Sequence, residues 1–450
     1  MAGLAEEFSL TVPAEESDDG IVVSSTAQRV ILGGVNGRRA LWRGIPLTTQ
    51  LCYSRSDVRQ MVTEAVVEYA LRHPDEAVIY VCFADGANNF CECVECRKLR
   101  PSDWYVMLLN QIDQQLTAKG LPTRIAFSVY VDLLWAPVRE RIHRPQRFLL
   151  IFSPYTRSYD VELWQELQKK IGDIAPFELN KLNFPTAPAE NLTMLKEWRE
   201  FFTGESLLFD YHLWQAYYGD PGQLGLAQTL HGDVAKLNKM GMAGFVSCQC
   251  QRISFPTNIY LEVLGRTLWT NSTTFESVAV KHFSQLYGDS GGEVMAYLQS
   301  VSTSLGRALL TMPHTPADKV GRARLAQLSS GWVEACSTPE RLIKAVETGC
   351  READPTAAAA WQILRHYFWF IGSFAEFHTF AWQGDARATQ ICDEIAVWLE
   401  RRLPQLHACL DTWMYKRLMQ HTLWVNELDF TERTELPVRN TSNRKDTEAF

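Results

Sequence analysis

The sequence predicts an α/β protein: a (βα)8 TIM-like barrel, incomplete at its N-terminal side and followed by an α-helical domain. From residue 57 onward, short apolar runs alternate with longer stretches that carry the 3.6-residue period of a helix. The runs are almost wholly apolar, as expected for parallel strands that are covered on both faces. After about residue 257 the strand signal stops and helical spacing takes over. These observations predict parallel βα units followed by a separate helical domain.

Five strands and four intervening helices are expected in the first half of the chain. The strands are AVIYVCF (77–83), RIAFSVYV (124–131), RFLLIF (147–152), SLLFDYHLW (206–214) and GFVSCQC (244–250). The helices are 57–73, 102–119, 188–203 and 223–240, and the first two begin at or just after Ser and Asp residues that can cap a helix. No G-x-G-x-x-G or G-x-x-x-x-G-K-S/T motif follows any strand, so a nucleotide-binding doubly wound sheet loses its main support.

The first 56 residues are too few for the strands that a full barrel needs. IVVSS (21–25) and RVILGG (29–34) predict a small hairpin, and LTTQLCYS (47–54) predicts one more strand. The barrel is therefore incomplete, or closed by another chain, or the sheet is open. The expected division is an N-terminal remnant with short strands (1–46), a barrel-like domain (47–256), an α-helical domain (257–430) and a polar, disordered tail (431–450).

The net charge and the aromatic content of the chain indicate which classes of binding partner to expect. The net charge of -8 is spread along the chain without a basic block, so neither nucleic acid nor an anionic membrane is expected as a partner. The aromatic content of 11% suits a carbohydrate ligand, whose rings present flat C–H faces to aromatic planes, although a large aromatic core gives the same composition. The N-terminus lacks the features of a signal peptide, so we expect a cytoplasmic protein as written, exported if an upstream segment is missing. The oligomeric state is left open.

Polar and aromatic residues gather where the predicted strands end. In a barrel these ends converge on one mouth, where barrel enzymes keep their chemistry. The residues are Asp85, Tyr130, Asp132, Tyr155, Arg157, Asp210, Tyr211, His212, Gln249 and Arg252. Any one of them alone is equally well explained as a solvated strand end, but their recurrence at five strands predicts a site.

A cysteine motif follows the first predicted strand. Cys91, Cys93 and Cys96 form a C-x-C-x-x-C pattern behind the turn at Asp85, in a chain with 11 cysteines. Zinc takes four ligands in structural sites, and Cys52 or Cys82 is the expected fourth. A structural zinc ion and a disulfide brace both remain open, and no cofactor is required beyond them. A redox pair has weaker support, and a catalytic zinc site would need histidines that this stretch lacks.

Several segments resemble a known family. QLCYSRSDV (50–58), YVCFADGANNFCECVECRKL (80–99) and SDWYVMLLNQI (102–112) resemble a bacterial domain-of-unknown-function family with a Q-L-C-Y/F/L strand and an N-D-G-x-x-x-x-C-x-C-x-x-C segment. That family is glycoside-hydrolase-like and similar in layout to the α-glucuronidases and β-hexosaminidases, which are (βα)8 barrels with appended domains. The segments 207–221, 237–252 and 265–288 look like its later strands and helices, so the resemblance covers roughly residues 48 to 300.

This chain departs from the family pattern in two places. The family's upstream part is missing or reduced to a remnant at 20–45, which puts an intact active site in doubt. Ala84 stands where the family usually has Asn before Asp-Gly, which removes one polar group from this strand end.

The resemblance implies a glycoside-hydrolase-like protein that acts on a glycan or a uronic-acid-containing sugar. Hydrolysis generally needs one carboxylic acid and a second carboxylate. The related barrel glycosidases place their acid at the strand end that Asp85 occupies here, and Asp210 is the second candidate, with Asp132 and Glu262 as less favoured ones. Tyr130, Tyr155, Tyr211 and Trp214 would form a sugar platform, and Arg157, His212 and Arg252 would bind the carboxylate of an acidic sugar.

The alternative is a non-catalytic carbohydrate-binding or scaffold protein on a degenerate barrel. A closed barrel in which Asp85 faces a second carboxylate would favour hydrolysis. An open sheet at the strand ends would favour the binding protein.

Overall fold

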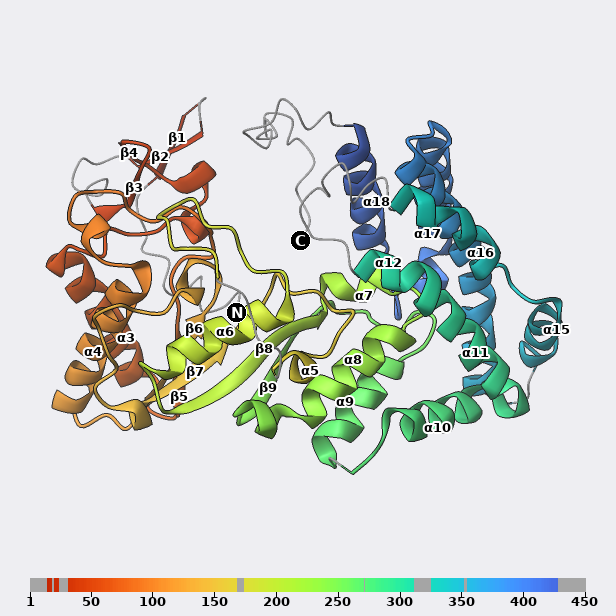
Figure 1. Ribbon diagram of the computed structural model, residues 1–450, viewed down its shortest axis with the longest axis horizontal. Helices are drawn as coiled ribbons and strands as arrows, with labels where there is room; N and C mark the ends of the chain where they lie inside the picture. Colours follow the sequence, from red (N-terminus) through yellow and green to blue (C-terminus); the bar gives the residue numbers. More distant parts are fainter. Residues whose placement is uncertain are drawn as a thin grey trace.

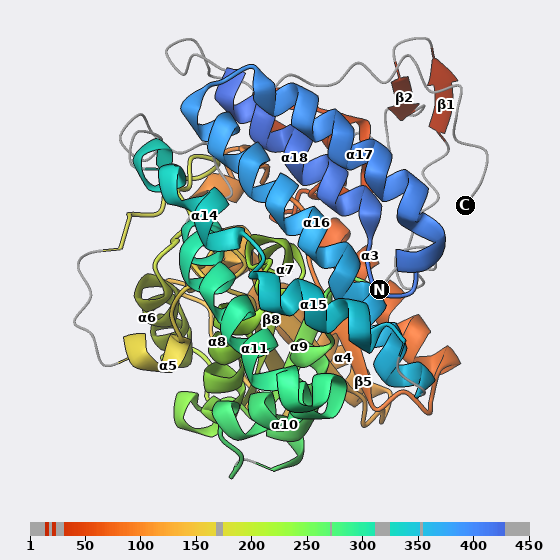
Figure 2. The same cartoon turned by 90° about the vertical axis from the view of Figure 1, so that its right-hand side faces the viewer.

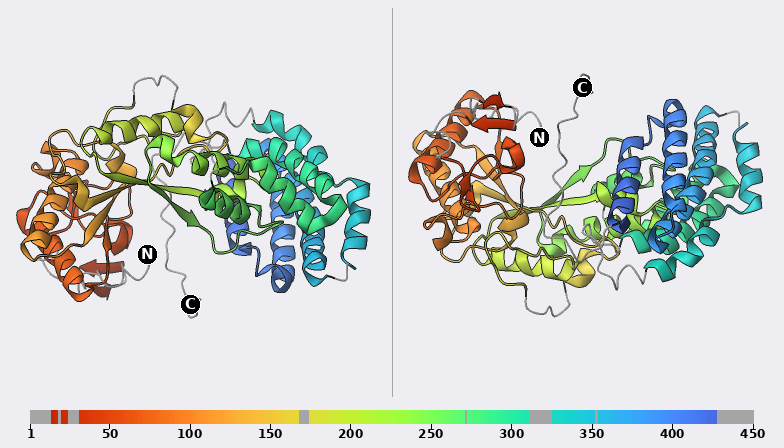
Figure 3. Two further views of the ribbon diagram at one scale, coloured as in Figure 1. Left: turned by 90° about the horizontal axis from the view of Figure 1, so that it is seen from below. Right: turned by 90° about the horizontal axis from the view of Figure 1, so that it is seen from above.

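A curled, five-stranded parallel sheet organises the first half of the chain (Figures 1 and 3). The computed structural model describes residues 14–17, 20–23, 31–167, 174–270, 272–310, 325–351 and 354–427. The strands β5 (Val78–Val81), β6 (Arg124–Val129), β7 (Phe148–Phe152), β8 (Glu205–Leu213) and β9 (Gly244–Gln249) each pair in parallel with the next. The sheet is a half-barrel, so the predicted parallel strands and the predicted incompleteness of the barrel are confirmed.

Helix α3 (Ser56–Arg72) precedes the sheet, and the connections between its strands are mainly helical. They contain α4 (Pro101–Ala118), α5 (Leu163–Glu166), α6 (Pro188–Arg199), α7 (Gln215–Gly219) and α8 (Leu224–Ala235), with the 3-10 turn Leu237–Met240 after α8. The four predicted helices are confirmed, although α6 and α8 end earlier than expected. Helix α4 begins where it does because Pro101 needs no hydrogen-bond partner at the first position and Asp103 accepts from the backbone N–H of Arg100 at 3.1 Å.

The two faces of the half-barrel differ in burial. On one face, Phe127 of β6 contacts Tyr105 of α4 and Trp198 of α6, with ring centroids 6.0 Å away in both cases. The other face carries Tyr80, Leu207 and Phe209, which remain partly exposed. Alternate residues of a strand point to opposite faces, and on this inner face Ala126, Ser128 and Ile151 of the central strands are buried. Parallel sheets are normally covered on both sides, and this only partly covered inner face is therefore the unusual feature of the fold.

Short antiparallel ladders precede the sheet. Strand β1 (Ala14–Ser17) pairs with β2 (Gly20–Val23), and β3 (Gly34–Val35) pairs with β4 (Arg38–Arg39). The predicted hairpin between 21–25 and 29–34 is therefore wrong, because residues 21–23 pair with the preceding segment; residues 24–30 lie outside the described part. The predicted strand 47–54 is reduced to one bridge between Leu51 and Leu32, because Pro46 starts a 3-10 turn.

The second half of the described chain is helical, as predicted. Its helices are α9 (Ile259–Trp269), α10 (Phe275–Tyr287), α11 (Gly291–Val301), α12 (Arg307–Leu310), α14 (Trp332–Cys336), α15 (Glu340–Gly349), α16 (Pro355–Gln383), α17 (Arg387–Leu406) and α18 (Thr412–Glu427). Helices α16, α17 and α18 lie side by side (Figure 2). The predicted tail 431–450 lies outside the described residues. In the part of the chain that the structure describes, no helix is both long enough and apolar enough to cross a bilayer.

A buried loop joins the helical region to the half-barrel. The Tyr367 hydroxyl of α16 donates to the Pro221 carbonyl at 3.0 Å, and the Leu224 N–H donates to Ser302 Oγ at 3.0 Å. Ser302 begins a π-helical turn (Ser302–Gly306) between α11 and α12. A side chain at Gly306 would collide with the Asp220 carboxylate, 2.3 Å from the Cβ position. The wider turn therefore gives the loop room to approach the helix.

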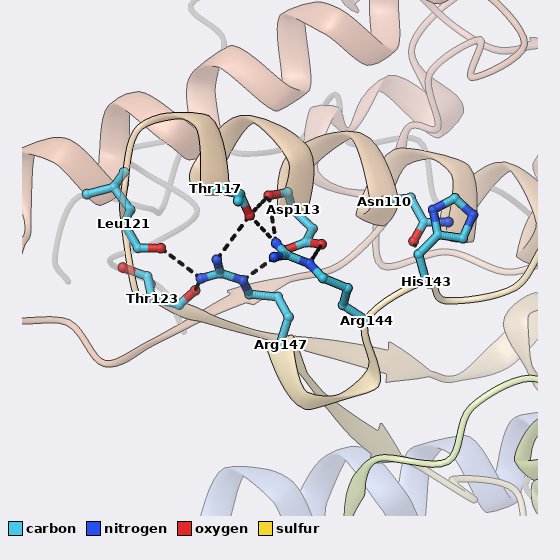
Figure 4. Close-up of polar contacts among 8 residues, drawn as sticks. All are labelled: Asn110, Asp113, Thr117, Leu121, Thr123, His143, Arg144 and Arg147. Atoms are coloured by element: carbon cyan, nitrogen blue, oxygen red, sulfur yellow. Dashed lines mark hydrogen bonds and ion pairs between the residues drawn. The ribbon is translucent and has the colours of Figure 1, made fainter.

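A carboxylate on α4 holds the segment that leads into β7 (Figure 4). Asp113 accepts from Arg144 Nε at 2.7 Å and from Arg147 Nε at 2.8 Å. Arg147 also donates to the carbonyls of Leu121 and Thr123, at 2.9 and 2.6 Å. The segments that lead into β6 and β7 are thereby joined to one side chain, and they set the position of these central strands.

Replacement of this carboxylate should destabilise the protein. In Asp113→Ala two guanidinium groups lose their acceptor, and we expect the free energy of unfolding to fall by about 3 kcal/mol. Urea denaturation measures this change. Asp75→Ala, at an exposed loop position, is the matched control and should change stability by less than about 0.5 kcal/mol. Equal effects of the two variants would contradict the role of Asp113.

Candidate functional site

Four cysteine side chains meet behind β5. The Cys52 sulfur lies 3.6 Å from Cys91 Sγ, 3.8 Å from Cys93 Sγ and 3.9 Å from Cys96 Sγ. All four sulfurs lie within 4.8 Å of one another, and we call this group the four-cysteine cluster. The predicted fourth member is therefore Cys52, because Cys82 is exposed elsewhere. The cluster is a potential metal site.

Polar groups surround the sulfurs. The Gly34 N–H donates to Cys91 Sγ at 3.3 Å, the Cys96 N–H donates to Cys93 Sγ at 3.4 Å, and Arg39 Nη2 donates to Cys52 Sγ at 3.6 Å. Hydrogen bonds from the thiols of Cys91 and Cys96 lower the pKa of the Cys52 thiol, and Arg39 acts in the same direction. The environment therefore favours negative charge on Cys52, as a metal ligand requires, whereas the hydrogen bonds to Cys52 raise the pKa of Cys91 and of Cys96.

Three tyrosines and one aspartate gather at the carboxyl ends of β5 to β8. The Tyr130 hydroxyl donates to Asp85 Oδ1 at 3.2 Å. The Tyr155 ring centroid lies 5.1 Å from that of Tyr130 and 6.4 Å from that of Tyr211, with interplanar angles of 63° and 66°. Asp85 is exposed and the three rings are partly exposed. We call these four residues the tyrosine cluster, and the structure brings them together as predicted.

Burial keeps the tyrosine hydroxyls neutral. Loss of solvent raises the pKa of Tyr155 to about 12, with Asp132 and Asp85 adding to the effect. Burial also raises the pKa of Tyr130 and of Tyr211. The cluster therefore presents three neutral phenol rings beside Asp85.

The backbone beside the tyrosine cluster is strained. Val131 has φ of 45°, a left-handed conformation that is rare for a β-branched residue. Asn88 also has a left-handed conformation, with φ of 53°. Its backbone N–H donates to both carboxylate oxygens of Asp132, the residue after Val131, at 3.1 and 3.0 Å. Strain of this kind persists where surrounding contacts enforce it, and it is concentrated at functional sites.

Asp210 belongs to a different environment from Asp85. It is fully buried on the helix-covered face, where Tyr159 donates to it at 2.6 Å and Arg157 Nη2 lies 3.3 Å away. Arg157 also pairs with Asp233 of α8 at 2.5 Å, and His212 Nε2 lies 2.9 Å from the same carboxylate. Burial opposes ionisation of Asp233, but Arg157 and His212 outweigh it and hold the pKa of that carboxyl below its usual value.

This burial corrects three predicted roles. Asp210, Arg157 and His212 have at most 1% of their surface exposed, so they do not reach a ligand at the tyrosine cluster. Their side chains follow the strand alternation: residues 210 and 212 face the helices, whereas Tyr211 faces the opposite way. The expected pair of facing carboxylates, Asp85 and Asp210, is not formed. We refer to Arg157, Tyr159, Asp210, His212 and Asp233 as the buried charge cluster.

The remaining predicted site residues lie at the ends of β8 and β9 or beyond. Trp214 follows β8, packs partly against the core and accepts a long hydrogen bond from Cys250 Sγ at 3.8 Å. Arg252 follows β9 and is half-buried. Glu262 pairs with Arg266 within α9. None of these contacts joins the tyrosine cluster.

Two asparagines that the sequence analysis did not single out join the segment around residue 88 to the segment around residue 180. Asn88 and Asn180 both adopt left-handed backbone conformations and bond across segments 90 residues apart. The signal for Asn88 was the sequence Asp-Gly-Ala-Asn-Asn, since Asn tolerates positive φ better than other residues. Nothing near Asn180 in the sequence indicated its partner.

Comparison of the chain with protein-family models, with curated proteins and with solved structures gives no match. The functional argument therefore depends on the chemistry of these clusters.

The buried Asp132 should make stability depend on pH. Burial raises its pKa to about 6, so between its unfolded value near 4 and about 6 the folded chain holds a proton that the unfolded chain has released. The free energy of unfolding should therefore fall as pH rises through this window. In Asp132→Asn that decrease should shrink, leaving the variant more stable than the natural chain by about 2 kcal/mol at pH 7.5. Urea denaturation from pH 4 to 7.5 tests this, and parallel curves for the two proteins would contradict it.

Proposed function

We propose that the protein binds a carbohydrate at the tyrosine cluster without hydrolysing it. The observation that carries the proposal is the convergence of Tyr130, Tyr155 and Tyr211 around the exposed Asp85. Aromatic faces take the C–H faces of a sugar ring, and hydroxyl and carboxylate groups bond its hydroxyls. The resemblance to glycoside-hydrolase-like proteins supports the same ligand class.

Binding has better support than hydrolysis. A glycosidase generally needs two carboxyl groups flanking the scissile bond. Asp210 is paired inside the buried charge cluster, and Asp132 is fully buried against the Asn88 N–H, so neither provides the second group. The inner face of the half-barrel is also only partly covered. These features support the reading of a degenerate barrel that retains a ligand site.

A neutral sugar has better support than a uronic acid. Two of the three basic residues expected to bind an acidic sugar, Arg157 and His212, are buried and paired with Asp233. Arg252 alone of that set stays partly accessible. The exposed charge in the tyrosine cluster is the carboxylate of Asp85, which repels another carboxylate. We therefore propose a neutral glycan.

Removal of the central ring should weaken glycan binding. Tyr155→Ala should raise the dissociation constant about five- to tenfold for a neutral oligosaccharide identified on a glycan array, because one aromatic contact is worth about 1 to 1.4 kcal/mol. Titration calorimetry measures the change, with Tyr155→Phe expected to retain most of the affinity. Trp413→Ala, at an exposed ring in the helical region, is the control. Binding that Tyr155→Ala leaves intact would overturn this site.

Hydrolysis is tested in the same experiment. If the natural chain releases reducing sugar, and if Asp85→Asn and Asp210→Asn each abolish that release, the mechanism with two carboxylates would be supported instead. Preference for uronate-containing glycans, lost on Arg252→Ala, would replace the neutral ligand with an acidic one.

We propose in addition that the four-cysteine cluster holds a structural zinc ion. Four sulfurs at a Zn–S distance of about 2.3 Å form a tetrahedron with edges of about 3.8 Å. The three S–S separations from Cys52, 3.6 to 3.9 Å, fit that edge and are far from the roughly 2.05 Å of a disulfide. Four protein ligands fill the coordination shell, which leaves no position for a substrate and favours a structural role.

Purified protein should contain about one zinc ion per chain. Cys52→Ser and Cys91→Ser should lose most of this metal, measured by mass spectrometry of the element, whereas Cys82→Ser, the control at an exposed cysteine, should retain it. A protein without metal that shows four fewer free thiols than its cysteine content would instead establish two disulfides.

A further inference from the structure

We propose that Asn88 and Asn180 are positioning residues that couple the four-cysteine cluster to the tyrosine cluster, so that metal binding raises the affinity for glycan. The proposal rests on the glycan and zinc sites proposed above and adds the regulation of the first by the second. It follows from three sets of contacts that run from Cys52 to Tyr155.

The first contacts tie Asp85 to the segment before Cys52. Gln50 Nε2 donates to the Ala84 carbonyl at 2.9 Å, and the Asp85 N–H donates to the Leu47 carbonyl at 3.2 Å. A Cβ atom at Gly86 would lie 2.9 Å from the Thr48 carbonyl, so the two backbones approach as closely as a glycine permits. A metal that fixes Cys52 therefore fixes the strand end that carries Asp85.

The second contacts join the cysteine loop to the segment around residue 180. The Leu182 N–H donates to Asn88 Oδ1 at 2.7 Å, and Asn88 Nδ2 donates to the Leu182 carbonyl at 3.2 Å. In the reverse direction, the Phe90 N–H donates to Asn180 Oδ1 at 2.8 Å and Asn180 Nδ2 donates to the Phe90 carbonyl at 2.9 Å. Each asparagine side chain thus bonds both the N–H and the carbonyl of one residue in the other segment, as a neighbouring β-strand would.

Neither segment has regular secondary structure where these bonds form. Their backbone groups depend on the two side chains for partners, and an unpaired buried backbone group is costly. Asn180 Nδ2 also donates to Glu92 Oε1 at 2.8 Å, next to the ligand Cys91. The asparagine pair is therefore hydrogen-bonded directly to the residues on either side of Cys91.

The third contacts reach the tyrosine cluster. The Phe184 ring lies 6.1 Å from that of Tyr155, and the Pro185 carbonyl accepts from Thr156 Oγ1 at 2.6 Å. On the other side, the Asn88 N–H holds Asp132, two residues beyond Tyr130. Loosening the asparagine pair therefore releases supports of both Tyr130 and Tyr155.

Coupling of this kind is reciprocal. If metal raises the affinity for glycan by a given factor, glycan raises the affinity for metal by the same factor. A merely structural defect lowers both affinities but leaves the effect of each ligand on the other unchanged, so the size of the coupling factor is the decisive readout.

The experiment uses the full chain, loaded with zinc or stripped by a chelator. Glycan affinity is measured by calorimetry in both forms, zinc affinity by competition with a chromophoric chelator with and without glycan, and backbone exchange by hydrogen–deuterium mass spectrometry. We expect zinc removal to weaken glycan binding at least about tenfold and to raise exchange in 84–92 and 178–184, with α16 unchanged.

Two variants separate the asparagine pair from the metal site. Asn180→Ala should retain one zinc ion, exchange faster in 178–184 and bring the coupling factor close to 1. Asn238→Ala, at an exposed asparagine after α8, is the matched control and should behave as the natural chain. Exchange in α16 reports whether Asn180→Ala remains folded.

Each contrary result is distinct. Unchanged exchange at 178–184 after zinc removal, or a coupling factor that survives Asn180→Ala, overturns the proposal. Faster exchange everywhere, including α16, makes the metal a global stabiliser and also overturns it. A natural chain that binds no glycan removes the proposed function, and faster exchange at 178–184 in zinc-free protein and in Asn180→Ala would then still support the positioning role of the asparagine.

Discussion

The loop from residue 84 to 99 has to hold its shape with little regular secondary structure, and the convergence of four sulfurs is the constraint that makes this feasible. The chain leaves β5 at Val81 and reaches the first turn of α4 at Pro101 with only a short 3-10 turn at Cys96–Lys98. Cys52 brings the preceding segment against this loop, and Gly33 is pressed against Gln50 with no room for a side chain. The position of Asp85 depends on that assembly.

The half-barrel places different chemistry on its two faces. On the covered face, the buried charge cluster fixes the ends of β7 and β8 to α8, and its charges compensate one another away from solvent. On the inner face, the strand ends present rings and one carboxylate to water. Asp210 and Tyr211 are consecutive in β8, and their side chains point to opposite faces. The same strand therefore contributes to the buried charge cluster and to the tyrosine cluster.

Much of the fold followed from the sequence because periodicity reports burial. The runs that became β5 to β9 are apolar on nearly every residue, and the long amphipathic stretches became helices. The failures came where pairing rather than periodicity decides: 47–54 has strand-like residues, but Pro46 and the neighbouring turn leave only Leu51 in a bridge.

The site was predictable in part for the same reason. Asp85 and the three tyrosines follow strands, so their convergence could be anticipated from the chain order. Asp210 also follows this rule but faces the helices, where its partner Arg157 pairs in turn with Asp233 of α8, and sequence spacing does not reveal such a network. The pairing of Asn88 with Leu182 spans a separation of 94 residues and leaves no periodic trace.

The π-helical turn at Ser302–Gly306 constrains the number of residues that the helical region can have where it contacts the half-barrel. It carries an extra residue relative to a regular α-helix, and it lies against the Asp220 loop of the half-barrel. Deleting one residue there would leave a regular α-helical turn, with the residues beyond it on nearly the same face, because the wider turn already absorbs the extra residue. The narrower turn would instead shift Ser302 and Gly306 relative to each other and disturb the contacts of both with the loop around Asp220. Homologous chains should therefore place insertions and deletions in the surrounding loops and keep the residue count of this turn.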